Sequence, residues 1–387
     1  MPFYPTLKRE PAAVQRRAGE GLLRLKSQLS AEVPLRTVDS TLLLGTWNIR
    51  EFDSPKYGDR LRESYFYIAE IVSRFDLVAI QEVRGDLKAL KRLISILGDQ
   101  YWDYLVTDVT LGRSGNDERL AFVYDTRKVR FEGLAGELVI PVKKKDELII
   151  QFARTPYIAG FRSAWTRFNL CTVHIYYGTS KALDPRRLKE IEDLADMLKG
   201  MAEKAAENFI VLGDFNIFQR SDATLHALER GGFRVPDELR ELPGSNVKQD
   251  RHYDQIATLA QTRRFGTTSR AGIFDFYKSV YRNIDQSAYA AEMRKQKTKE
   301  SYQQWRTYQM SDHFVMWLEL KTDFGTEYLN ELLENSATNV TFGQPIPEDS
   351  APRPRKTRTT KRKKVAAKKA VPKTKRAPAK KKKTRTR

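Results

Sequence analysis

A short stretch near the middle of the chain, Gly213-Asp214-Phe215-Asn216, combines residue types that could do chemistry. It follows the apolar run 209–212, which is typical of a buried strand. Glycine lets the backbone turn where that strand ends. The carboxylate and the amide are two residues apart, so they are expected to point the same way. Such a pair could bind a divalent metal, contact a phosphate or take a proton from water. The alternative is an Asx turn that caps the next loop.

Polar residues also recur at the ends of other predicted strands. Asn48 follows the strand-like run 41–47, and Glu82 follows the run 76–80. Loops at one end of a layered sheet structure converge, so we expect these side chains to form one site. The proposed set is Asn48, Glu82, His174, Asp214, Asn216, Asp254, Asp312 and His313.

The donor atoms of this set favour one class of reaction. Oxygen ligands without cysteine favour Mg²⁺ or Mn²⁺ over structural zinc. A histidine beside a carboxylate suits proton transfer or stabilisation of a charged phosphate oxygen. Together they suit hydrolysis of a phosphodiester, in which a metal polarises the phosphoryl group and a carboxylate activates water.

The order of predicted elements indicates the fold that must hold these residues. Helical patterns alternate with strand-like runs in both halves of the chain, whereas the middle contains strand-like runs only. This order predicts an α+β fold, a four-layer αββα sandwich of two mainly antiparallel sheets flanked by helices. The runs in the middle are 101–107, 120–124, 138–141, 148–153, 157–161 and 167–176.

Composition divides the chain into four parts. Residues 1–40 form a basic leader that is partly helical, and residues 41–334 form the domain with the candidate site. Residues 335–350 have few large apolar side chains and are interpreted as a linker. Residues 351–387 are rich in Lys, Arg, Ala and Pro, so they cannot bury a core and are predicted to be a disordered basic tail.

The positive charge of the chain is concentrated in that tail. The 387 residues include 69 basic and 49 acidic side chains, and 19 of the basic ones lie in 351–387, which has no acidic residue. Residues 1–350 are therefore close to neutral. The tail predicts electrostatic binding to a polyanion such as DNA, although a polycation also binds RNA and anionic membranes.

Cysteine usage and hydropathy bear on the compartment. Cys171 is the only cysteine, so no intrachain disulfide can form, which fits a reducing compartment. We find no apolar signal segment at the N-terminus and no window long and apolar enough to span a membrane. An intracellular protein is expected, cytoplasmic or nucleoid-bound in a bacterium and nuclear in a eukaryote. The sequence leaves the oligomeric state open.

Eight short motifs, in order along the chain, resemble the endonuclease/exonuclease/phosphatase superfamily and, within it, the pancreatic-type deoxyribonucleases. The resemblance extends from residue 41 to residue 320 and implies the four-layer sandwich described above. The motifs are Trp47-Asn48-Ile49-Arg50, Ile80-Gln81-Glu82-Val83-Arg84, Leu111-Gly112-Arg113 with Glu118-Arg119, Phe152-Ala153-Arg154-Thr155-Pro156, Val173-His174, Gly213-Asp214-Phe215-Asn216, Tyr253-Asp254-Gln255-Ile256 and Ser311-Asp312-His313.

The resemblance implies roles for the carboxylates and amides. It implies that Glu82 is the main metal ligand, with Asn48 and Asp312 nearby. It also implies that Asp214 positions or deprotonates the attacking water, with Asn216 beside it. The metal implied is Mg²⁺ or Mn²⁺.

The resemblance further implies two pairs of histidine and carboxylate. His313 is implied to contact the scissile phosphate and to be oriented by Asp254. His174 is implied to be its partner, paired with Glu118.

Two arginines match positions that contact nucleic acid in the family. Arg154 is implied to bind phosphate, and Arg84 to reach the minor groove of double-stranded DNA. The alternative for both is a solvated surface charge. The sequence also departs from the family, because Asn116 replaces a groove-stacking tyrosine and the insertion 282–310 is longer than in those nucleases. That insertion could be a lid, an extra DNA-binding surface or a surface helix.

Three functions remain open on the sequence alone. The first is a divalent-metal-dependent DNA endonuclease with little sequence preference, held on DNA by its basic tail. The second is a phosphoesterase of the same fold that acts on RNA, an inositol phosphate or a lipid head group. The third is a catalytically idle DNA-binding protein, which the presence of every matched catalytic residue disfavours.

Overall fold

The computed structural model describes residues 2–52, 54–109, 117–141, 150–296 and 299–338. The chain divides into two compact units, residues 1–332 and 333–387. The predicted basic tail, and all but the first four residues of the predicted linker, lie outside the described residues.

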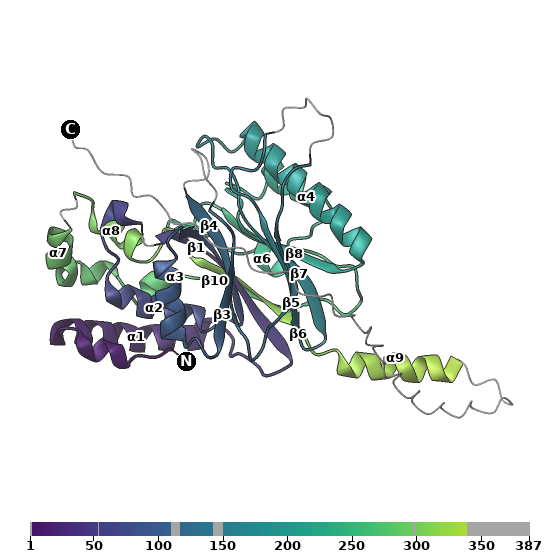
Figure 1. Ribbon diagram of the computed structural model, residues 1–387, viewed down its shortest axis with the longest axis horizontal. Helices are drawn as coiled ribbons and strands as arrows, with labels where there is room; N and C mark the ends of the chain where they lie inside the picture. The colour runs from purple at the N-terminus through teal and green to yellow at the C-terminus, as the bar shows by residue number, and fades with distance from the viewer. Residues whose placement is uncertain (1, 53, 110–116, 142–149, 297–298, 339–387) are drawn as a thin grey trace, which may run out of the picture. The chain divides into compact units, whose positions relative to one another are not determined.

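Two mixed sheets form the centre of the first unit (Figure 1). One has six strands in the order β10-β11-β1-β2-β4-β3, and the other has five in the order β5-β6-β7-β8-β9. Neighbouring strands are antiparallel except for β1 with β2 and β7 with β8. The strands are β1 (Thr41–Phe52), β2 (Leu77–Arg84), β3 (Trp102–Val106), β4 (Glu118–Asp125), β5 (Arg130–Glu137), β6 (Tyr157–Ser163), β7 (Thr166–His174), β8 (Asn208–Asp214), β9 (Asp254–Leu259), β10 (Thr267–Phe274) and β11 (Val315–Lys321).

Two hydrophobic cores arise because successive side chains of a strand point to opposite faces. On β1, Leu42 and Leu44 face the other sheet and pack in the core between the sheets. Leu43 and Trp47 face outward and pack in a second core beneath a layer of helices. A central strand that is buried on both faces reads as a continuous apolar run, as residues 209–212 of β8 do.

Helices cover the outer face of each sheet, which completes the expected four-layer sandwich (Figure 1). Five helices lie on the six-stranded sheet: α1 (Ala12–Glu32), α2 (Arg62–Val72), α3 (Lys88–Leu97), α7 (Gln286–Lys295) and α8 (Tyr302–Gln309). The five-stranded sheet is covered by α4 (Pro185–Ala205), whose N-cap Asp184 accepts the backbone N–H groups of Arg186 and Arg187. The other helices are α5 (Ala223–Arg230), α6 (Asp237–Arg240), α9 (Gly325–Thr338) and the short 3₁₀ segments η1 (Pro5–Arg9), η2 (Pro55–Tyr57), η3 (Phe276–Lys278) and η4 (Asn283–Asp285).

The N-terminal leader is an integral part of the first unit. Leu22, Leu25 and Leu29 of α1 are buried in the second core. Arg17 of the same helix pairs with the buried Glu63 of α2 at 3.0 Å. Residues 1–40 therefore support the sheet that carries part of the candidate site.

The insertion 282–310 packs against the body through aromatic side chains. Tyr289 of α7 and both Tyr302 and Trp305 of α8 are buried, and Tyr289 stacks on Tyr281 with ring centroids 4.6 Å apart. These rings belong to the second core, so α7 and α8 are anchored layers of the fold. Only their outer residues could contact a ligand.

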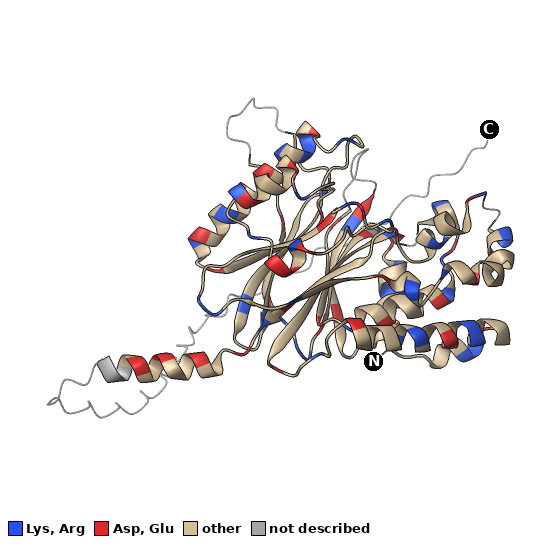
Figure 2. Ribbon diagram, turned by 180° about the vertical axis from the view of Figure 1, so that it is seen from behind, with Lys and Arg blue, Asp and Glu red and all other residues tan. Residues whose placement is uncertain are grey.

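Charges of both signs are interspersed on the described surface. Figure 2 shows basic and acidic residues alternating along α1 and α4, as the near-neutral composition of residues 1–350 predicts. Within the described ranges, no helix has the length and apolar character needed to cross a membrane.

Candidate active site

Three candidate residues lie in one row across the five-stranded sheet. In the strand register His174 of β7 is opposite Asp214 of β8, and Asp214 is opposite Asp254 of β9. A close approach of the β7 and β8 backbones precedes this row. At Gly213, with φ of +134°, a Cβ atom would lie 2.2 Å from the carbonyl oxygen of Val173. Glycine is therefore required for the strand to deliver Asp214 to this position.

We expect Gly213→Ala to lower the free energy of unfolding by about 2 kcal/mol or more, because strained backbone alone costs ~1–3 kcal/mol and the clash adds to it. Urea denaturation followed by circular dichroism measures the change. Gly200→Ala is the matched control, since Gly200 lies within α4 with no atom within 4 Å of an added Cβ. An unchanged midpoint for Gly213→Ala would contradict the required close approach.

The six-stranded sheet supplies the facing residues. Asn48 lies on β1, and Glu82 lies at an irregularity in β2 where its φ is +63°. Ser311, before β11, ties two strands together, because its Oγ donates to the Asn48 carbonyl and accepts the backbone N–H of His313. The two sheets thus bring their polar strand ends to one place.

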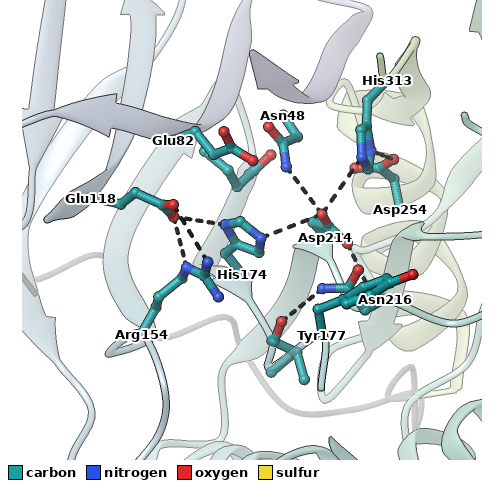
Figure 3. Close-up of polar contacts among 12 residues, drawn as sticks. Asn48, Glu82, Glu118, Arg154, His174, Tyr177, Asp214, Asn216, Asp254 and His313 are labelled. Atoms are coloured by element: carbon teal, nitrogen blue, oxygen red, sulfur yellow. Dashed lines mark hydrogen bonds and ion pairs between the residues drawn. The ribbon is translucent and has the colours of Figure 1, made fainter. Parts of the chain in front are cut away.

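Asp214 is the centre of the polar contacts (Figure 3). Its Oδ2 accepts the amide N–H of Asn48 at 3.0 Å and lies 3.5 Å from Nε2 of His174 and 3.8 Å from Nε2 of His313. Burial alone would raise the pKa of Asp214, but the two histidines and its hydrogen bonds hold the pKa below its usual value. The carboxylate is therefore ionised at neutral pH.

Asn216 has a structural role in addition to its proximity to Asp214. Its backbone N–H donates to Oδ1 of Asp214 at 2.9 Å, so the Asx turn considered as an alternative is present as well. Its side-chain Nδ2 donates to the Ile175 carbonyl at 2.8 Å, and its φ is +53°. The amide group fixes the loop that follows β8.

His313 is paired with Asp254, the carboxylate assigned to it from the sequence. Nδ1 of His313 lies 2.7 Å from Oδ2 of Asp254, and both side chains are buried. Burial by itself lowers the pKa of His313, but Asp254 and Asp214 more than offset it, so the pKa lies well above its ordinary value. His313 is therefore an imidazolium whose Nε2–H is directed toward Asp214.

His174 is paired with Glu118, and Arg154 joins them. Nδ1 of His174 lies 3.0 Å from Oε2 of Glu118, and the Arg154 guanidinium donates to both oxygens of Glu118 at 2.6 and 3.4 Å. Burial tends to raise the pKa of Glu118, but His174 and Arg154 outweigh it and lower the pKa to about 2. Arg154 is 8% exposed and is not a solvated charge.

Two groupings of residues could hold a divalent cation. Ligand atoms of Glu82, Glu118 and His174 lie within 4.8 Å of one another. However, Glu118 is already engaged by the Arg154 cation, which weakens it as a ligand. Asn48 has a buried Oδ1 with no hydrogen-bond partner, so it offers an available oxygen.

Like charges crowd around Glu82. Burial and the nearby Glu118 and Asp312 carboxylates raise its pKa. A bound cation would relieve this repulsion, so Glu82, the free oxygen of Asn48 and Asp312 fit a divalent metal better than the group that contains Glu118. Asp312 is 43% exposed and lies 3.6 Å from Nε of Arg50.

Arg84 is the remaining predicted site residue within the described ranges. Nη1 of Arg84 lies 3.4 Å from Oε2 of Glu51, whose backbone N–H donates to Glu82 at 2.6 Å. Arg84 is thus connected to Glu82 through Glu51. Asn116 and the Leu111-Gly112-Arg113 motif lie outside the described residues.

Sequence reasoning gave no role to Arg187, which organises the rear of the site. This side chain is completely buried, and its guanidinium donates to the carbonyls of Asn216 at 2.9 Å and Tyr177 at 3.2 Å. It joins the loop after β8 to the loop after β7. Charged residues are common on the first turn of an amphipathic helix, so no pattern in the sequence distinguishes this arginine as one that points inward.

Comparisons with known proteins agree with the fold and bear on the chemistry. Residues 45–277 match the Endonuclease/Exonuclease/phosphatase family. A deoxyribonuclease of Thioalkalivibrio sp. (strain K90mix) is 35% identical over 184 residues, which are 46% of this chain and 46% of that protein. Deoxyribonuclease-1 of Equus caballus is 29% identical over 202 residues, 50% of this chain and 67% of that protein.

A solved structure supports the fold alone. The endonuclease/exonuclease/phosphatase of Bacteroides vulgatus has a TM-score of 0.50 at 13% identity, covering 74% of this chain and 100% of that one. The match to the bacterial deoxyribonuclease, by contrast, spans about half the length of that protein.

Proposed function

The chain belongs to the endonuclease/exonuclease/phosphatase family, and we propose that it is a divalent-metal-dependent DNA endonuclease with little sequence preference. The observation that carries the proposal is the ionised Asp214 between two histidines, each backed by its own carboxylate. Because several relatives of the chain are deoxyribonucleases, we propose DNA as its substrate. We also propose that the DNA is double-stranded and that the protein acts inside the cell.

The metal would be held by Glu82 and the free oxygen of Asn48, with Asp312 nearby. When bound, Mg²⁺ or Mn²⁺ would supply Lewis-acid polarisation of the phosphoryl group. This role accounts for the crowded carboxylates around Glu82 and for the unpaired Asn48 oxygen.

The side chains around Asp214 would perform the proton and charge steps. Asp214 orients the attacking water and takes its proton as the water oxygen bonds to phosphorus. The imidazolium of His313 donates its Nε2–H to a phosphate oxygen, which stabilises the charge that develops there. The bond between phosphorus and the leaving oxygen then breaks, and the leaving oxygen keeps the bonding electron pair and takes a proton from solvent water. Glu118 and Asp254 keep both imidazole rings oriented.

Substrate comparison tests this function. Supercoiled plasmid, a single-stranded RNA and an inositol phosphate would each be incubated with Mg²⁺, with and without chelator. We expect the plasmid to be nicked and the chelator to abolish nicking. Cleavage of the RNA and release of phosphate from the inositol phosphate should be much slower. Glu82→Gln removes one charged ligand and should raise the Mg²⁺ concentration needed for half-maximal nicking. Faster turnover of RNA or inositol phosphate than of DNA would overturn the assignment.

We also propose that residues 351–387 bind DNA through counterion release. The tail carries 19 positive and no negative side chains, whereas residues 1–350 are nearly neutral. A protein ending at Asp349 should therefore bind long duplex DNA more weakly at low salt. The plot of log affinity against log salt should flatten by about 0.9 for each lost phosphate contact.

Turnover at saturating DNA serves as the internal control for this truncation. It should hardly change, because Glu82, Asp214 and His313 all precede the tail. Fluorescence anisotropy at several salt concentrations gives the slope. An identical slope for the two proteins would remove the tail from DNA binding.

A further inference from the structure

A pair of stacked tyrosines lies next to the part of the candidate site that contains Asn48 and Asp312. Tyr57 of η2 and Tyr308 of α8 have ring centroids 3.7 Å apart and ring planes inclined by 17°. Both side chains are half-buried. This differs from the other large aromatic residues of the insertion, Tyr289, Tyr302 and Trp305, which are buried in the core. Tyr57 covers one face of the Tyr308 ring, so the side of Tyr57 turned away from Tyr308 is the face left for a ligand.

Arg50 connects this pair to the site. Its Cζ lies 3.8 Å from the centre of the Tyr308 ring, and its guanidinium donates to the hydroxyls of Tyr308, at 2.6 Å, and Thr307. Its Nε lies 3.6 Å from Asp312, and its backbone N–H donates to Ser311 at 3.2 Å. The rings therefore adjoin the same strand ends that carry Asn48 and Glu82.

The local chemistry suits a nucleic acid strand. Aromatic faces stack nucleobases of any sequence, and adjacent cations attract the phosphates between them. Besides Arg50, the exposed Lys56 places its ammonium 5.1 Å from the Tyr57 ring centre. In an intact duplex the faces of each base are covered by its neighbours, so only an unpaired or displaced base can present a face to a tyrosine.

We propose that Tyr57, Tyr308 and Arg50, together called the aromatic rim, form a subsite for an unpaired nucleobase of the strand whose phosphate enters the candidate active site. The proposal rests on the DNA endonuclease function above and adds a preference for unpaired stretches within otherwise double-stranded DNA. It assigns a function to the end of the insertion 282–310, because α8 supplies Tyr308. The matched family region ends at residue 277, before this helix.

The test compares Michaelis constants for a short single-stranded DNA and for the same strand in a duplex. Tyr57→Ala should raise KM for the single strand by about 5-fold to 100-fold, the range expected for one lost base–aromatic stack. KM for the duplex should change less than about twofold, since no free base face is available there. Tyr57→Phe keeps the ring and should retain most of the single-strand affinity.

Tyr101→Ala is the matched control. Tyr101 is also an exposed tyrosine under an arginine, with Cζ of Arg127 4.4 Å from its ring centre, but it precedes β3 at the opposite strand ends from Glu118. Its replacement should leave both KM values unchanged. Thermal melting reports the fold of each variant, and Tyr308→Ala, which removes the ring behind Tyr57, gives a second test of the subsite.

Two outcomes separate this subsite from the function on which it rests. If the wild-type protein cleaves DNA but the Tyr308 and Tyr57 variants raise both KM values equally, or neither, the rings only anchor α8 and the subsite is excluded. If the wild-type protein cleaves neither form of DNA, the endonuclease function itself fails.

Discussion

Asp214→Asn is expected to lower the turnover number on plasmid DNA by about 10²-fold to 10⁴-fold, the range for loss of a positioned general base. The amide group cannot take a proton from water. The substitution also removes the negative charge that faces Nε2 of both His174 and His313. KM should change little, because the proposed DNA contacts lie elsewhere. Initial rates of nicking at saturating DNA, with the melting temperature measured in parallel, give the result.

Asp250→Asn is the matched control for that substitution. Asp250 is an exposed carboxylate in the loop before β9, where it accepts from Asn246, and it has no part in the proposed chemistry. It should retain full turnover. Nicking by Asp214→Asn within a few-fold of the wild-type rate would exclude Asp214 as the base.

The sequence predicts the layers of the fold well because most of the central strands are buried. Runs such as 209–212 and 77–80 are continuously apolar, and each matches a strand between two covered faces. By contrast, β5 and β10 are edge strands with polar, partly exposed sequences and were not predicted. The run 138–141 was predicted as a strand, but its apolar residues follow β5 and none of them is in a strand. An edge strand is held by pairing on one side only, so it needs no apolar pattern.

The sequence could also place the candidate site at one end of the sheets, because it lies where apolar strands meet polar residues. The pairing of His313 with Asp254, at a separation of 59 residues, was inferred from family resemblance and not from local pattern. Features that depend on backbone geometry could not be predicted from the sequence. The positive φ of Glu82 and the inward direction of Arg187 follow from contacts between distant segments, which no local pattern encodes.

The arrangement of the tyrosines shows the same limit. Residues 282–310 looked helical and aromatic, and the sequence allowed a lid, a DNA-binding surface or a plain surface helix. Three of the four tyrosines and tryptophans in that region pack as one cluster with Tyr281, while Tyr308 lies on Tyr57 from another part of the chain. Only the tertiary structure distinguishes an anchoring ring from one at the rim of the site.

His313→Ala and Asp254→Ala are each expected to lower turnover by about 10²-fold to 10⁴-fold, and the double variant should be little worse than either single one. Asp254 is completely buried beside His313 and helps to raise its pKa, so the pair would act as a unit. Without Asp254 the ring loses both its orientation and part of the charge that keeps it protonated. A double-mutant cycle on the turnover number measures the coupling.

Asp254→Asn separates orientation from charge in this pair. The amide oxygen can still accept from Nδ1 of His313, but the negative charge is gone, so the pKa of His313 should fall toward its ordinary value. If His313 must be protonated, the activity of Asp254→Asn should decline at a lower pH than that of the wild-type protein as pH rises. Strictly additive losses in the cycle, together with an unshifted alkaline limb, would show that His313 and Asp254 act independently.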